Sequence, residues 1–154
     1  MVRNGFAVLD NPSGLFGQKD SVLYLYGEVY GLGGLTTDSS GEAAEYSVTY
    51  TCFSESGDVY RDLGTRTVPK PGSSAVIAES FDIKYWPAGL YRLQVAADDH
   101  ASGLADTAEA MFRIVSESEI AEIETRGLQA TWEPYDTLSI EARTAMVSFL
   151  LSPA

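Results

Sequence analysis

The chain has 154 residues, and its composition of 45% hydrophobic and 21% charged residues is typical of a folded globular protein. Its 22 acidic residues outnumber its 10 basic residues, which gives a net charge of −12 at pH 7. Such a surface repels nucleic-acid phosphates and anionic lipid headgroups, so we expect no nucleic-acid partner.

Cys52 is the single cysteine, which excludes an intrachain disulfide and a Cys/His metal framework. It lies in the strand-like segment YSVTYTCF, where a thiol behaves as a small buried hydrophobe. The segment GLGG at residues 31–34 lacks the last glycine of a nucleotide-binding loop, and we expect no cofactor. No stretch of 18 apolar residues is present, so we expect no membrane insertion in this segment.

The first two strands are predicted at residues 21–32 and 44–53, where side chains alternate with a period of two. One face of the first strand carries Tyr24, Tyr26, Glu28 and Tyr30, and one face of the second carries Tyr46, Val48, Tyr50 and Cys52. Residues 31–43 between them are rich in glycine, serine and threonine, and they predict a long flexible connection.

Turn residues at 55–58 and 70–72 separate three short runs, a spacing that is typical of sandwiches and barrels. Residues 90–97 alternate again, and residues 106–115 are their predicted partner strand. The pattern predicts a mostly β protein, an Ig-like antiparallel β-sandwich of about seven strands over residues 1–115.

The β pattern ends at Ser116, and residues 116–154 are predicted to form a helical linker towards a further module. Glutamates early in this segment favour a helix N-terminus. A second helix is predicted from Asp136 or Ser139 to about Leu151. Because it is apolar nearly all round, we expect a missing segment or a second copy to cover it, and the second alternative corresponds to a homodimer through residues 137–154.

The tyrosine row of Tyr24, Tyr26 and Tyr30, with Tyr46 and Tyr50 on the next strand, has two interpretations. An exposed, flat aromatic row would stack on sugar rings or on a partner protein. A half-buried row would be part of the core with hydroxyls at its margin. The exposure of the three rings on the first strand decides between them.

A structural corner is predicted in WPAGLYRLQVAADD, residues 86–99. In Ig-like sandwiches, a tyrosine just after the crossover corner donates a hydrogen bond to the backbone a few residues upstream. Tyr91 follows Pro87 and Gly89 at this spacing, and we expect it to clamp the corner.

Asp98, Asp99 and Asp106 lie around His100, the single histidine, and they are the candidates for a metal site. Oxygen-rich loops can hold calcium, but the spacing of acidic residues that is typical of a calcium-binding loop is absent here. Aspartates in a turn are more often turn formers. We therefore expect no metal at this turn. No G-x-S-x-G motif accompanies the histidine, and we expect no catalytic residue and no enzyme activity.

Three segments together resemble the Ig-like, macroglobulin-like β-sandwich modules of bacterial envelope proteins, especially those that precede a GWxTD domain. The matching residues are Tyr26, Glu28, Val29 and Tyr30, then Tyr46, Val48 and Tyr50, then residues 87–95 with Asp98. The resemblance covers roughly residues 15–115, and the GWxTD signature itself is not present. It implies a non-catalytic module outside the cytoplasm, in the periplasm or at the cell surface, and it brings no catalytic residues.

The sequence therefore predicts a binding or spacer module of a larger envelope protein, which contacts a protein partner or a downstream domain of the same chain. The alternative is a carbohydrate-binding module that uses Tyr24, Tyr26 and Tyr30.

Overall fold

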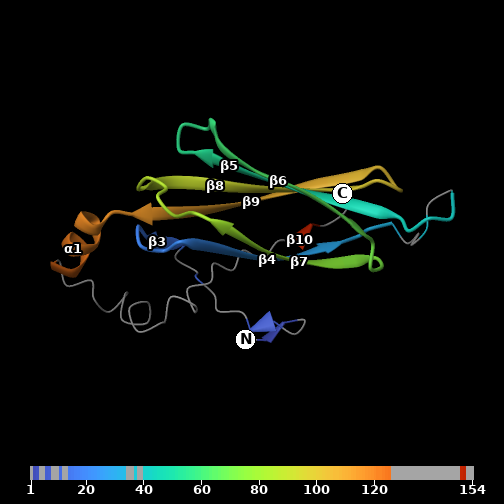
Figure 1. The fold of residues 1–154 in the computed structure, drawn as a ribbon, viewed down its shortest axis with the longest axis horizontal. Helices are drawn as coiled ribbons and strands as arrows, with labels where there is room; N and C mark the ends of the chain where they lie inside the picture. The colour runs from blue at the N-terminus through green and yellow to red at the C-terminus, as the bar shows by residue number, and fades with distance from the viewer. Residues whose placement is uncertain are drawn as a thin grey trace.

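A computed structural model describes residues 2–3, 6–7, 11, 14–33, 37, 40–125 and 150–151. Two β-sheets pack face to face, as predicted for a β-sandwich (Figure 1). The strands are β1 (Val2–Arg3), β2 (Phe6–Ala7), β3 (Leu15–Gly17), β4 (Val22–Tyr30), β5 (Glu45–Ser54), β6 (Val59–Pro69), β7 (Ser74–Asp82), β8 (Gly89–Asp99), β9 (Leu104–Val115) and β10 (Leu150–Leu151), and the helix is α1 (Glu117–Thr125). The larger sheet has the order β3-β9-β8-β5-β6 and the smaller one β10-β4-β7, while β1 pairs with β2.

The order of the strands is Ig-like. The chain alternates between the sheets, because β4 and β7 belong to the smaller sheet while β5, β6, β8 and β9 belong to the larger one. Antiparallel pairs join β4 to β7, β5 to both β6 and β8, and β8 to β9, whereas β3 lies parallel to β9. This topology and the mostly β content confirm the predicted fold class.

The core lies between the sheets and uses the predicted alternating faces. Leu23, Leu25 and Val29 of β4 are buried, as are Tyr46, Val48, Tyr50 and Cys52 of β5 and Tyr91, Leu93, Val95 and Ala97 of β8. The ring of Tyr50 meets that of Phe81 across the interface, with centroids 5.2 Å apart. Cys52 is fully buried, and burial raises the pKa of its thiol to about 12, so it packs as a small hydrophobe.

An aromatic cluster fills one end of the sandwich. Trp86 packs against Tyr60 at 4.9 Å and against Tyr91 at 5.4 Å between ring centroids, and Tyr91 stacks on Phe112 at 5.4 Å. Phe16 meets the edge of Phe112 at 5.8 Å. Five elements supply these rings, so the cluster fixes how β3, β6, β8, β9 and the corner before β8 meet.

One strand of the larger sheet was not expected from the sequence. β3 was not expected, because three residues are too few for a visible alternation, and it is held by parallel pairing with β9. The predicted turn residues at 55–58 and 70–72 do lie on either side of β6, a continuous strand of 11 residues. β6 is an edge strand with two register shifts against β5, which disturb its alternation.

Helix α1 begins at a capping box. The Ser116 hydroxyl accepts a hydrogen bond from the Glu119 amide at 3.2 Å, and Glu119 Oε2 accepts one from the Ser116 amide at 2.8 Å. The hydrogen bond from the Ser116 backbone, together with those from Arg113 and the Ser116 side chain, lowers the pKa of Glu119 to about 2. No helix in the described part of the chain is long and apolar enough to cross a bilayer.

The predicted second helix was expected to reach about Leu151, but Leu150–Leu151 form β10, which pairs in parallel with Glu28 and Val29 of β4. The rest of that helix lies outside the described residues. The same holds for nearly all of the predicted dimer contact over residues 137–154.

Candidate interaction surfaces

The predicted corner is present. The Tyr91 hydroxyl donates a hydrogen bond to the carbonyl oxygen of Pro87 at 2.8 Å, and the Tyr91 ring is 4% exposed. Burial, with Tyr60 nearby, raises the pKa of the Tyr91 hydroxyl to about 12, so it remains a donor. A Cβ at Gly89 would make only ordinary contact with the Tyr91 ring, at 3.9 Å. The corner is therefore held by Tyr91 rather than by the glycine.

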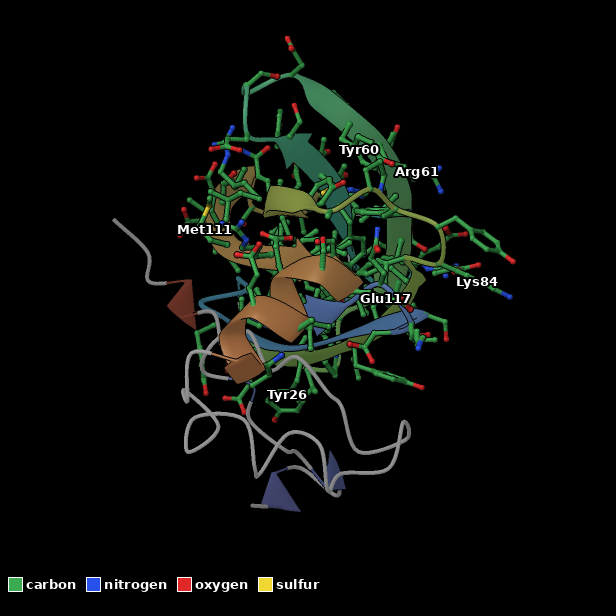
Figure 2. All side chains as sticks on the ribbon, turned by 90° about the vertical axis from the view of Figure 1, so that its left-hand side faces the viewer. Tyr26, Tyr60, Arg61, Lys84, Met111 and Glu117 are labelled. Atoms are coloured by element: carbon green, nitrogen blue, oxygen red, sulfur yellow. The ribbon has the colours of Figure 1, made fainter. Side chains whose placement is uncertain are left out.

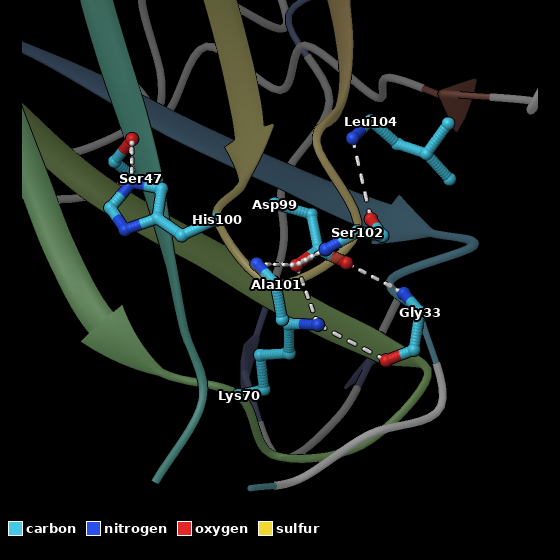
Figure 3. Close-up of polar contacts among 8 residues, drawn as sticks. All are labelled: Gly33, Ser47, Lys70, Asp99, His100, Ala101, Ser102 and Leu104. Carbon is cyan, nitrogen blue, oxygen red and sulfur yellow. Dashed lines mark hydrogen bonds and ion pairs between the residues drawn. The ribbon is translucent and has the colours of Figure 1, made fainter. Parts of the chain in front are cut away.

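The Asp98–Asp106 region is arranged differently from the turn that was expected. Asp99 is the last residue of β8, is 2% exposed, and forms an ion pair with the buried Lys70, whose Nζ lies 2.5 Å from Asp99 Oδ1 (Figure 3). The Gly33 amide donates to Asp99 Oδ2 at 2.7 Å, and Lys70 Nζ donates to the Gly33 carbonyl at 3.1 Å. The Ala101 amide donates to the other carboxylate oxygen, Oδ1, at 3.1 Å.

This network joins three separate connections: the segment after β4, the end of β6, and the β8–β9 turn. Burial by itself raises the pKa of the Asp99 carboxyl, but hydrogen bonds from Lys70, Ser102, Gly33 and Ala101 outweigh it and hold the pKa well below its ordinary value. Asp99 is thus a charged structural anchor.

The three aspartates do not form a common site. Asp98 and Asp106 are exposed, whereas Asp99 is committed to Lys70. Within the described ranges, no group of three or more His, Cys, Asp or Glu side chains is arranged to hold a metal ion. His100 is exposed, and its Nε2 lies 3.0 Å from the Ser47 hydroxyl, which ties the turn to β5 (Figure 3).

The tyrosine row of β4 is exposed only in part. Tyr24 is 37% and Tyr30 is 42% exposed, but Tyr26 between them is 3% exposed. The hydroxyls of Tyr26 and Tyr30 donate to the two carboxylate oxygens of Glu28, the first at 2.7 Å. Tyr46 and Tyr50 are buried core residues. The carbohydrate-binding alternative expected a row of exposed rings, and Tyr26 does not meet this expectation.

A different surface, not expected from the sequence, crosses the outward face of the larger sheet. Phe53 of β5, Arg92 of β8 and Met111 of β9 are direct neighbours in register, and we call them the outer row. Met111 is 54% exposed, and the Arg92 guanidinium lies 4.4 Å from the centre of the Phe53 ring. Each residue alone is an unremarkable surface position, so only the strand register could reveal the row.

Arg92 is held in place within the outer row. Its Nη1 lies 2.5 Å from Glu109 Oε1, and the Gln94 amide donates to the same oxygen at 3.0 Å. These hydrogen bonds lower the pKa of the Glu109 carboxyl. A guanidinium fixed on one side by a carboxylate and below by a ring presents a defined surface to solvent.

Comparison with protein-family models and with curated proteins finds no match to this chain. The proposals below therefore depend on the fold, on these surfaces and on the sequence pattern.

Proposed function

We propose that this chain is a non-catalytic Ig-like binding module of a larger bacterial cell-envelope protein, located outside the cytoplasm, and that it contacts a protein partner through the outer row. The location follows from the sequence resemblance. The alignment of Phe53, Arg92 and Met111 across three strands of one sheet supports the proposed contact.

The chemistry of the outer row supports protein binding. Aromatic residues, methionine and arginine are the types enriched at protein–protein interfaces. A β-sheet holds their backbones rigidly, and the Glu109 carboxylate and the Phe53 ring hold the Arg92 head. Little freedom of the Arg92 side chain is then lost on binding, which favours affinity.

Site-specific photo-crosslinking in bacteria tests this proposal. A benzophenone amino acid is placed at Met111 and, as a matched control on the same strand, at the exposed Thr107. We expect a discrete higher-mass adduct from position 111 that disappears with Arg92→Ala and is not formed from position 107. No adduct from position 111, or equal adducts from both positions, would overturn the assignment of the outer row.

A further inference from the structure

Two cations stand apart from the other basic side chains. Every other lysine and arginine whose side chain the structure describes forms an ion pair with a carboxylate. Arg61 and Lys84 pair with no described carboxylate, although the chain has 22 acidic residues. Instead, the Arg61 guanidinium lies 5.4 Å from the centre of the Trp86 ring, and Lys84 Nζ lies 5.0 Å from the centre of the Tyr85 ring.

A tight turn between β7 and β8 presents Lys84 and Tyr85. Ile83 and Trp86 flank them and are buried at 2% and 3% exposure, and the Trp86 amide donates to the Ile83 carbonyl at 3.0 Å. Asp82 Oδ1 accepts the Lys84 amide at 2.8 Å. The two exposed residues are thus carried on a turn whose ends are fixed in the core.

Tyr85 itself has an unfavourable conformation and position. Its φ is +67°, which makes it the one non-glycine residue with positive φ in the part of the chain that the structure describes. Its side chain is 85% exposed, so neither backbone preference nor burial favours a tyrosine here. Strained backbone of this kind clusters at binding sites, where function retains it.

Trp86 lies beneath Arg61 and directly follows the turn residues Lys84 and Tyr85. It carries Arg61 of the edge strand β6 on its ring, while Lys84 and Tyr85 directly precede it in the chain. Its indole Nε1 is buried and has no hydrogen-bond partner among the described residues. Its N–H resonance is therefore a sensitive reporter of any change at this surface.

We propose that Arg61, Lys84 and Tyr85, here called the basic turn surface, bind an acidic extended segment of a partner protein. The planar guanidinium of Arg61 can donate two parallel hydrogen bonds to one carboxylate, and the ammonium of Lys84 adds a second positive charge. Cations that rest on aromatic rings have no carboxylate to release before they meet a ligand. On a chain with a net charge of −12, this is a surface where an acidic ligand would find unpaired positive charge.

The basic turn surface rests on the proposed protein-binding role but is separate from the outer row. Figure 2 shows Arg61 and Lys84 on one side of the sandwich and Met111 on the opposite side. The two surfaces can therefore be inactivated independently.

Titration of the ¹⁵N-labelled full chain with N-acetylated hexaglutamate, followed by NMR, tests the inference. We expect saturable shifts of the Lys84, Tyr85 and Arg61 amides and of the Trp86 indole N–H, with smaller shifts as salt is added. Each of Arg61→Ala and Lys84→Ala should weaken binding by about two- to fivefold, and the double variant should weaken it by up to about 25-fold.

Matched controls separate the surface from general charge. Arg66→Ala removes an exposed cation of β6 that pairs with Glu79, and Met111→Glu disrupts the outer row, so both should leave the titration unchanged. Equal shifts with N-acetylated hexaserine, or equal weakening by Arg66→Ala, would overturn the proposal. So would saturable shifts with an acidic polysaccharide such as polygalacturonate and none with hexaglutamate. Loss of the Met111 crosslink with an intact titration would count against the outer row alone.

Discussion

Lys70 Nζ lies 2.5 Å from Asp99 Oδ1, and both side chains are almost completely withdrawn from solvent, at 0% and 2% exposure. A buried ion pair of this kind is tolerated only when each charge is compensated, and here the backbone of Gly33 supplies both a donor and an acceptor. The ion pair therefore forms only when the segment after β4, the end of β6 and the β8–β9 turn all lie in their native positions.

Asp99→Asn should destabilise the fold by about 3–5 kcal/mol, because the Lys70 ammonium is left buried without its counter-charge. Urea denaturation followed by circular dichroism measures the free energy of unfolding. Asp98→Asn is the matched control, since Asp98 is exposed on the same strand, and it should change stability by less than about 0.5 kcal/mol. Equal effects of the two substitutions would show that the ion pair does not contribute.

Stability should fall as the pH drops below the ordinary carboxyl pKa of 3.8, because the pKa of Asp99 in the folded protein is lower than that in the unfolded chain. Above that value both states are ionised and the contribution is complete; below it the unfolded chain binds the proton first. Urea denaturation at about pH 7 and about pH 3 measures the loss. Asp99→Asn should lose less stability over the same interval, and an unchanged slope would contradict this origin.

Tyr91→Phe should lower the free energy of unfolding by about 0.5–1.5 kcal/mol, because the Pro87 carbonyl loses its donor while the ring packing remains. Tyr24→Phe is the control: Tyr24 is 37% exposed, and this change should have little effect. Thermal and urea denaturation measure both variants. A loss of less than about 0.5 kcal/mol for Tyr91→Phe would mean that the clamp is unimportant.

The sequence predicted those features that depend on neighbouring residues. The alternation along β5 grouped the four residues that form its core face, and the Pro-Ala-Gly corner gave the position of the Tyr91 hydrogen bond. Both follow from spacing within one segment, because side chains two positions apart share a face of a strand.

Features that depend on distant segments were missed. Asp99 reads as a turn residue because its partner Lys70 lies far away in the sequence, directly after β6, and two adjacent aspartates give no sign that one is buried. The exposure of Tyr26 was left open, because alternation places it opposite Leu25 and a tyrosine suits either a surface or a core margin, and it is buried at 3% exposure. The outer row needed the register of β5, β8 and β9, which no single strand encodes.

Tyr85→Asn should leave the free energy of unfolding unchanged or raise it. Asparagine adopts positive φ more readily, and this relief of roughly 1 kcal/mol offsets the lost contact with Lys84, which at an exposed site is worth about 0.5 kcal/mol. Urea denaturation measures the change beside Lys84→Asn. A loss of more than about 1 kcal/mol would show that Tyr85 is kept for stability and not for contact.

The parallel pairing of β3 with β9 determines in which direction a pulling force loads the hydrogen bonds between these strands. Leu15 pairs with Arg113 and Gly17 with Val115, so the first strand of the sandwich and the last strand of its larger sheet point the same way. A pull on the chain before β3 and after β9 drags these strands in opposite directions along their own axes. Their hydrogen bonds are then loaded together in shear and do not open one at a time.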